Sequence, residues 1–286
     1  MSIKKNLRAE SRVSLDNACT QLGVSRSGFL AWNSRMQQKS SIDKDFLCAM
    51  HKIVEEFPYY GYPRVTKALQ REGYKVNHKR VYRLMKEHNL LCKLKKYKPV
   101  TTQSNHNFPK YSNLAKGFVP TAINQLIVAD ITYIALLTEF VYLAILMDVF
   151  SRKFIGWDLS RNVDTQLTLR ALNMVIALRG KTNLKNCIHH SDQGVQYAAD
   201  AYVQRLEYTQ MRPSMGEVGN SYENAFAESA IKTIKYNEVY MKEYDSFADA
   251  YINIKKFIEE VYNKKQLHSG IGFVPPDEFE MMQKMG

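Results

Sequence analysis

The sequence predicts a mixed α/β fold preceded by an all-α region. Apolar side chains recur at helical spacing through the first third of the chain, and β-branched and aromatic runs begin near residue 125. After three such runs, helices and strands alternate, which is typical of a mixed sheet covered by helices. The basic charge is confined to the first third: residues 1–100 hold 21 Lys and Arg against 8 Asp and Glu, and the remainder is nearly neutral.

Length and composition narrow the class of protein. A chain of 286 residues with 45% hydrophobic residues is long enough for about two domains, each with its own core. The longest apolar run, Phe140 to Met147, is far shorter than the roughly 20 residues that span a bilayer, so no membrane span is expected. The four cysteines are scattered without a Cys-x-x-Cys pair, and no secretory signal opens the chain. We therefore expect a cytoplasmic protein.

The basic excess of the first third points to a polyanionic partner. Each Lys or Arg that contacts a phosphate releases condensed counterions and so favours binding to nucleic acid. The alternative is a lysine-rich helical surface without a partner, and charge alone does not choose between the two.

Residues 1–40 contain a helix-turn-helix-like segment. Between Leu15 and Trp32 the apolar residues follow helical spacing, with a break at Gly23. Ser25 is a plausible N-cap for the helix that restarts after the break. The segment therefore predicts two helices joined by a short turn.

Residues 41–98 predict a second helix-turn-helix-like, DNA-binding domain. A helix is expected from about residue 42 to 56, followed by helical stretches at 61–73 and 76–88. In the last stretch Val81, Leu84 and Met85 can face a core, and basic residues lie on the opposite side, as in a recognition helix. The expected DNA contacts are Lys75, Asn77, which is also the N-cap, Lys79, Arg80 and Arg83. A small helical bundle with an ordinary charged surface is the alternative.

Residues 99–120 are predicted to be a linker, because they are rich in Pro, Asn, Thr and Ser and show little periodicity. Lys93, Lys95 and Lys96 precede it and are three further candidate DNA contacts. The basic segment could follow a phosphate backbone or could hold two domains apart.

Residues 121–286 predict the α/β domain. Strands are expected at 125–134, 140–147 and 153–159, as an antiparallel meander, because short polar breaks separate them. The segments that follow are a helix at 164–178, a strand at 186–190, and helices at 198–206, 223–239 and 247–262.

Three carboxylates of this domain stand out. Asp130 lies within an apolar strand, where an ionised group is costly without a partner or a metal. Asp192 follows a short strand, at the carboxyl end where α/β sheets bind ligands. Glu228 lies on a helix with Lys232 and Lys235 at i+4 and i+7, so one helix face carries a carboxylate and two ammonium groups.

Together the three carboxylates predict a metal site. They would repel each other unless divalent cations neutralised them, and hard oxygen ligands suit Mg²⁺ or Mn²⁺. Two such ions can activate the attacking oxygen and stabilise the leaving oxygen of a phosphodiester. Each residue also has a structural alternative: a hydrogen-bonded strand residue for Asp130, a turn former for Asp192, and an ion pair with Lys232 for Glu228. These alternatives explain the joint arrangement poorly.

Other polar residues near the predicted site are weaker candidates. His189 and His190 could be metal ligands, but neighbouring residues of a strand point to opposite faces, so at least one is expected to be structural. Asp148 is followed by Ser151 and Arg152, which favours a turn or a local ion pair over a role as a ligand.

Several motifs of the sequence resemble the Asp-Asp-Glu transposases and retroviral integrases. They are Asp130-Ile-Thr-Tyr, Ser191-Asp-Gln-Gly-Val-Gln-Tyr, and a segment that runs from Ser214 to Glu228, with 35 residues between Asp192 and Glu228. The resemblance is greatest to the second-frame protein of the IS-three family of bacterial insertion sequences. It extends to Tyr60-Gly-Tyr-Pro-Arg, to the stretch 76–85 and to the tail Val261-Tyr-Asn-Lys-Lys-Gln-Leu-His-Ser-Gly-Ile-Gly-Phe.

The resemblance implies a ribonuclease H-like catalytic core. It also implies that Asp130, Asp192 and Glu228 hold two Mg²⁺ or Mn²⁺ ions, and that the chain nicks DNA and then transfers a strand. Lys232 and Lys235 match integrase lysines that contact the element end. The implied partners are the terminal repeats and target DNA, further copies of the chain on DNA, and a first-frame protein joined by frameshift, a segment that this sequence does not include. The expected setting is the bacterial nucleoid.

Three positions depart from the family pattern. Ile127 replaces a common Trp, Glu223 replaces the usual Asp, and Pro63 replaces a frequent Arg. Pro63 removes a possible phosphate contact and is expected to restrict Tyr62 to extended geometry. The alternatives to a transposase are a non-catalytic DNA-binding regulator, a decayed copy, and a plain nuclease.

Overall fold

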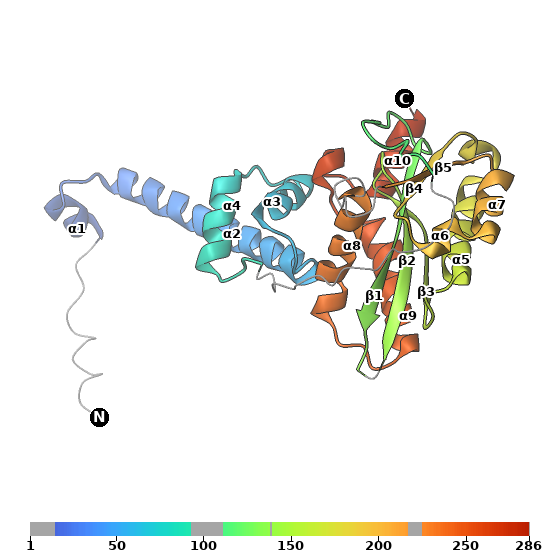
Figure 1. Ribbon diagram of the computed structural model, residues 1–286. Coiled ribbons are helices and arrows are strands. Elements are labelled where there is room, and N and C mark those ends of the chain that lie inside the picture. Colours follow the sequence, from blue (N-terminus) through green and yellow to red (C-terminus); the bar gives the residue numbers. More distant parts are fainter. Residues whose placement is uncertain (1–14, 93–110, 138, 217–224, 286) are drawn as a thin grey trace.

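The computed structural model describes residues 15–92, 111–137, 139–216 and 225–285. A helical region lies to one side of a core that contains a single sheet (Figure 1). Within the described residues, no helix is both long enough and apolar enough to cross a membrane.

The core is built on a mixed sheet of five strands in the order β3-β2-β1-β4-β5. The first three strands are antiparallel neighbours, whereas β4 runs parallel to β1 and β5 runs parallel to β4. The strands are β1 Leu126–Ala135, β2 Phe140–Asp148, β3 Phe154–Ser160, β4 Ile188–Ser191 and β5 Arg212–Met215. This arrangement is ribonuclease H-like, and it confirms the predicted meander. β5 was not predicted.

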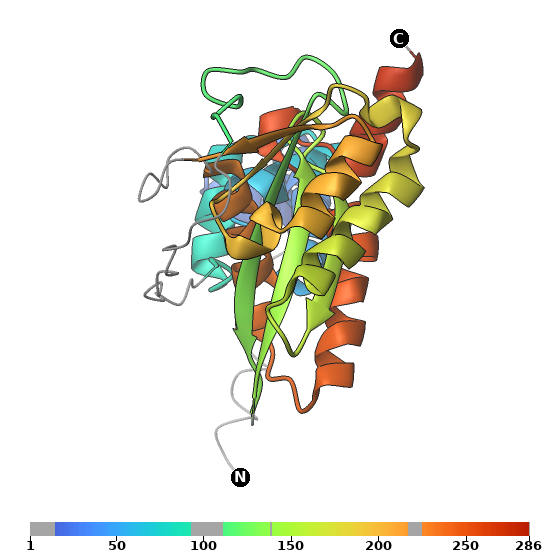
Figure 2. The ribbon, with the colours of Figure 1, turned by 45° about the vertical axis from the view of Figure 1, so that its right-hand side comes forward.

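Helices cover both faces of the sheet (Figures 1 and 2). The alternation of side chains along β1 divides the core: Ile127 and Ala129 face one helical layer, and Leu126 and Val128 face the other. Gly156 lets β3 and the first layer approach closely, because a methyl group there would overlap the carbonyl of Ala171. The first layer is α5 Thr165–Arg179, α6 Val195–Ala198 and α7 Asp200–Tyr208, and the second is α8 Ala225–Asn237 and α9 Phe247–Lys256.

The helical region contains α1 Leu15–Gln21, α2 Arg26–Glu56, α3 Tyr62–Arg71 and α4 His78–Glu87. The predicted turn between the first two helices is confirmed: Gly23 has φ +66°, and Ser25 caps α2 by accepting the N–H of Gly28 at 3.1 Å. Asn77 caps α4 by accepting the N–H of Lys79 at 2.9 Å, as predicted.

The prediction of two separate helices between residues 26 and 56 is wrong, because α2 is one continuous helix. The stretch between the two predicted helices, residues 33–41, contains no Gly or Pro, so nothing in it ends the helix. In Figure 1 the first half of α2 extends away from α3 and α4, toward α1. Trp32 on that half is 52% exposed.

The expected effect of Pro63 is also wrong. Tyr62 is helical and begins α3, while Gly61 takes the extended N-cap conformation with φ −75° and ψ 165°. Pro63 therefore lies in the first turn of the helix, where its missing N–H removes no intrahelical hydrogen bond.

The helical region packs directly on the core. Tyr60 is 1% exposed, its ring stacks on Phe57 with centroids 4.5 Å apart, and its hydroxyl accepts the N–H of Leu267 at 2.8 Å. Glu56 and Lys265 form a second, exposed contact across the same junction at 2.6 Å. The Tyr60-Gly-Tyr-Pro-Arg motif and the tail motif therefore meet in space, and one apolar core spans both regions.

The tail is fixed to the sheet by buried polar side chains. After α9 the chain continues as a π-helix, Phe257–Tyr262, and then Asn263 bonds both backbone groups of Phe154, accepting its N–H at 3.1 Å and donating to its carbonyl at 2.9 Å. The described residues also contain three 3-10 helices, Thr182–Leu184, Val239–Met241 and Ser269–Ile271. The tail ends in α10 Pro276–Met285.

The predicted linker lies partly outside the described residues. Its described part, from residue 111, lies on the core: the N–H of Leu114 bonds Ser214 Oγ at 2.8 Å, and Leu114 and Ala115 pack against the apolar core. This part of the linker is therefore not a free spacer. Residues 99–110, with Lys93, Lys95 and Lys96 before them, lie outside the described residues.

Candidate active site

Asp130 lies on the face of β1 that is turned toward α8. It lies two residues after Val128 and therefore on the same face of the strand, and its Oδ1 accepts the N–H of Ile131 at 2.8 Å. Burial, then the charges of Asp192 and Glu228, raise the pKa of Asp130 to about 8, against opposing effects of that N–H and of Lys235. A carboxylate in this environment is short of positive charge.

Asp192 directly follows β4, the strand next to β1. The two strands pair in parallel with Val128 opposite His190, so two further residues in the same register bring Asp192 beside Asp130. Asp192 Oδ1 accepts the N–H of Gly194 at 3.0 Å. Asp192 therefore also forms the turn that was its structural alternative. The predicted position at a strand's carboxyl end is confirmed.

Glu228 lies in the first turn of α8 and is exposed to solvent. Partial burial raises the pKa of its carboxyl group, and its charge acts on Asp130. Two turns further along, Lys235 is half-buried, with Nζ 4.6 Å from the ring centroid of Tyr133. Burial lowers the pKa of Lys235, and the opposite charge of Asp130 partly offsets this. Lys232 is exposed on the same helix.

The charges of Asp192 and Glu228 both act on Asp130, but the three carboxylates do not form a closed cluster. Within the described residues, no group of three His, Cys, Asp or Glu side chains is close enough to hold a metal ion. The chemistry of the site nevertheless suits a hard divalent cation, because carboxylate oxygens are hard ligands and because burial, then the charges of Asp192 and Glu228, raise the pKa of Asp130.

The neighbouring histidines are structural, as their spacing predicted for at least one of them. His189 Nε2 is 2.9 Å from the hydroxyl of Tyr202, and burial with the charge of His190 lowers its pKa to about 3. His190 Nδ1 lies 2.9 Å from Ser214 Oγ. Both side chains are buried. Ile127 is fully buried beside them and fills an apolar core position.

Asp148 forms the predicted turn. Asp148 Oδ1 accepts two hydrogen bonds from Ser151, from its backbone N–H at 3.0 Å and from its hydroxyl at 3.2 Å. Asp148 Oδ2 accepts the N–H of Asn124 at 2.7 Å. Because Asp148 lies opposite Ile127 on β2, it is three residues of β1 away from Asp130. Asp148 therefore belongs to a structural network near the start of β1, away from Asp130.

The predicted DNA contacts of the helical region are largely exposed. α4 buries Val81 and Met85 as expected. Arg80 is a correction, because it is half-buried with its guanidinium 5.1 Å from the ring centroid of Phe46. Exposed side chains from the predicted set are Lys75, Asn77, Lys79 and Arg83, the last in an i,i+4 ion pair with Glu87. Glu223 lies outside the described residues.

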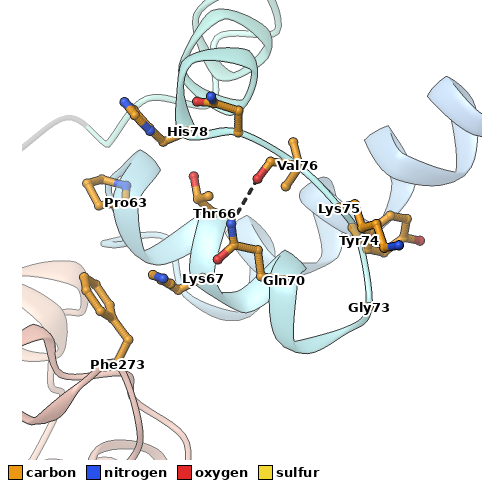
Figure 3. Close-up of a pocket in the computed structure, with 11 residues that line it drawn as sticks. Pro63, Thr66, Lys67, Gln70, Gly73, Tyr74, Lys75, Val76, His78 and Phe273 are labelled. Atoms are coloured by element: carbon orange, nitrogen blue, oxygen red, sulfur yellow. Dashed lines mark hydrogen bonds between the residues drawn. The ribbon is translucent and has the colours of Figure 1, made fainter.

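A groove of about 910 Å³ lies between the helical region and Phe273 of the tail (Figure 3). It is lined by α3, by the turn before α4 and by Phe273 of the tail. Lys67, with Nζ 5.7 Å from the ring centroid of Phe273, and Lys75 add positive charge to it. Sequence reasoning missed Lys67, since only the tertiary contact with the tail distinguishes it from other helix lysines.

Comparison with protein families gives three matches along the chain. A model described as "HTH-like domain" matches residues 42–98. Two models described as "Integrase core domain" match residues 120–221 and 209–276.

Two relatives align over almost the whole chain. An uncharacterized protein of insertion element IS600 from Shigella sonnei is 35% identical over 91% of this chain and 96% of its own length. The transposase InsF of insertion sequence IS3A from Escherichia coli (strain K12) is 31% identical over 95% of each chain. Among solved structures, a chain from the simian T-cell lymphotropic virus intasome in complex with the PP2A regulatory subunit B56 gamma aligns with a TM-score of 0.47 and 13% identity, over 81% of this chain and 74% of that chain.

Proposed function

This chain belongs to the IS-three family of insertion-sequence transposases, and on that premise we propose that it nicks DNA at the ends of an insertion sequence and joins the freed 3′ end to a target. Family membership supports a role in DNA transposition and the binding of DNA. The proposed catalytic residues are Asp130, Asp192 and Glu228, and the proposed cofactor is a pair of Mg²⁺ or Mn²⁺ ions.

The electrostatic state of Asp130 carries the proposal. Its pKa is raised to about 8 by burial and by the charges of Asp192 and Glu228, which come from two other elements of the core. A purely structural carboxylate would be expected to have a compensating partner, and the charge of Lys235 offsets the raised pKa of Asp130 only in part. The site is therefore prepared for an added cation.

The three carboxylates would hold the two ions through their oxygen atoms. When bound, the ions would activate the attacking oxygen and stabilise charge on the leaving oxygen of the phosphodiester. Lys232 is exposed on the Glu228 helix and could contact a phosphate of the bound strand. Lys235, close to Tyr133 and Asp130, would limit the negative charge of the site.

The helical region would bind and position the element end. Its exposed basic side chains on α4 and in the turn before it supply phosphate contacts, and Asn77 and Lys79 lie at the N-terminal end of α4, which in helix-turn-helix proteins reaches base edges. Because transposition joins two element ends to one target, we expect at least two copies of the chain to assemble on DNA.

The proposal is tested by incubating the full chain with a labelled duplex that carries the DNA flanking its gene, with Mg²⁺, with Mn²⁺ and with a chelator. The expected products are a nick at a repeat boundary and a joined strand, both only when a divalent ion is present. Binding of the flanking DNA without cleavage in either metal would contradict the proposal and support a non-catalytic regulator. Nicking without any joined product would support a plain nuclease.

A further inference from the structure

Three side chains from distant parts of the sequence lie close to the contact between the helical region and the core. They are Arg64 on α3, Arg152 in the turn between β2 and β3, and His268 in the tail. Arg64 belongs to the Tyr60-Gly-Tyr-Pro-Arg motif, and His268 belongs to the tail motif. None of the three has a role in the catalytic site described above.

A chain of contacts connects them. The guanidinium of Arg64 lies 5.6 Å from the ring centroid of Tyr60, whose hydroxyl bonds the N–H of Leu267, the residue before His268. The rings of His268 and Tyr262 are 4.5 Å apart, and the hydroxyl of Tyr262 donates to the carbonyl of Arg152 at 3.0 Å. Both arginines are therefore connected to the surroundings of His268, and the charges of both act on it.

The guanidinium of Arg152 packs on an aromatic ring and lies near Gly270. It lies 4.3 Å from the ring centroid of Phe226, at the start of α8. On another side is Gly270, where an added Cβ would be 3.8 Å from Arg152 Nε. The backbone of Arg152 has φ +62°, a conformation unusual for a residue with a side chain, which indicates that the turn is constrained. Aromatic stacking leaves the edge of the guanidinium available for hydrogen bonds.

Among the described residues, neither arginine has an ion-pair partner, although the charge of Asp148 acts on Arg152. Within the part of the chain that the structure describes, neither Arg64 nor Arg152 forms an ion pair or a side-chain hydrogen bond, and His268 Nε2 is buried without a hydrogen-bond partner. By contrast, Arg170 pairs with Asp158 at 2.7 Å. Burial and the positive charges of both arginines lower the pKa of His268 to about 3. A further positive charge on His268 is therefore disfavoured at this junction.

We propose that Arg64, Arg152 and His268 form a binding site for one backbone phosphate of DNA. Half-buried guanidinium groups suit this ligand, because their planar forks form charge-assisted hydrogen bonds with phosphate oxygens. Neutral His268 can donate from one ring nitrogen. The proposal rests on the proposed function only in taking DNA as the ligand.

The location of the site explains what a phosphate contact there would achieve. Arg152 touches Phe226, two residues before Glu228, and Arg64 is on α3, which packs with α4. Figure 1 shows α3 on the side of the core that carries α8. A duplex that extends from α4 to Glu228 would pass this junction, and a phosphate held there would fix the register between the helical region and the catalytic carboxylates.

The salt dependence of DNA binding tests the proposal. Binding of the full chain to a labelled flanking duplex would be measured by fluorescence anisotropy over a range of NaCl concentrations, with divalent ions chelated so that catalysis is not required. In the double variant Arg64→Gln/Arg152→Gln, the slope of log K against log salt should become shallower by about 0.9, the value for one lost phosphate contact, and each single variant should show part of that change. Affinity at low salt should fall roughly tenfold.

Two further variants exclude a structural explanation. Arg170→Gln removes a guanidinium from α5, on the other face of the sheet, and should leave the slope unchanged. Arg152→Lys keeps the charge but not the fork, so it should keep the slope and lose part of the affinity. Unchanged slopes in both glutamine variants would overturn the proposal, and so would weaker binding that follows a lowered melting temperature while the slope stays the same.

The outcome is separable from that of the proposed function. Shallower slopes in a chain that never nicks DNA would keep the phosphate site and reject the catalytic proposal. Metal-dependent nicking by a chain whose arginine variants keep the wild-type slope would do the reverse.

Discussion

Replacing Glu228 by Gln is expected to reduce metal-dependent nicking and joining by roughly a thousandfold or more while leaving DNA binding nearly unchanged. Gln has the shape of Glu without the charge, so the change removes one anionic ligand from the proposed site and with it several kcal/mol of transition-state stabilisation. Glu228 is exposed on the first turn of α8, so the fold should tolerate the substitution. Single-turnover cleavage of an end-labelled duplex measures the rate, and anisotropy measures binding.

The matched control is Glu243→Gln, which makes the same chemical change at an exposed position before α9. Its nicking rate should stay within about twofold of the wild type. A Glu228→Gln variant that nicks as fast as this control would remove Glu228 from the catalytic site, whatever the wild type does.

Replacing Glu280 by Ala should cost about 3 to 5 kcal/mol of the free energy of unfolding, because it leaves Arg179 buried without its partner. The two side chains are 6% and 8% exposed, with Arg179 Nη1 2.8 Å from Glu280 Oε2 and a second bond between Nη2 and Oε1. Glu280 also accepts the hydroxyl of Ser151 at 2.7 Å, which connects α10 to the turn held by Asp148. Urea denaturation followed by circular dichroism measures the loss.

Glu278→Ala provides the comparison on the same helix. Glu278 pairs with Arg71 of α3 at 2.5 Å, but both side chains are substantially exposed, at 33% and 44%. An exposed pair of this kind contributes about 1 kcal/mol or less. Equal losses in the two variants would contradict the view that the buried network, rather than helix propensity, fixes α10 to the core.

The core could be predicted from the sequence because its signals are local. The strands that form the meander are long and apolar, and the polar breaks between them mark their ends. Asp130 was identifiable as an anomaly within such a strand, and Asp192 by its place after another. β5 was missed because it has four residues, one of them Pro213, and it is a strand only by pairing with β4.

The junction between the two regions could not be predicted, because it depends on contacts between residues far apart in the chain. Tyr60 bonds Leu267 across 207 positions, and nothing near either residue signals the other. The same holds for Arg64 and Arg152, whose charges both act on His268 only when α3, a sheet turn and the tail pack together. The continuity of α2 differs from the expected pair of helices for another reason: residues 33–41, between the two expected helices, contain no Gly or Pro that would end a helix.

The central claim is that Asp130, Asp192 and Glu228 hold one metal centre, and the most direct test maps where the metal binds. Fe²⁺ would replace Mg²⁺ in the full chain bound to flanking DNA, and ascorbate with peroxide would generate radicals that cut the polypeptide near the ion. The account predicts cuts close to all three residues, competed by excess Mg²⁺ and lost in Asp130→Asn. Cuts confined to other segments, or an unchanged pattern in Asp130→Asn, would contradict it.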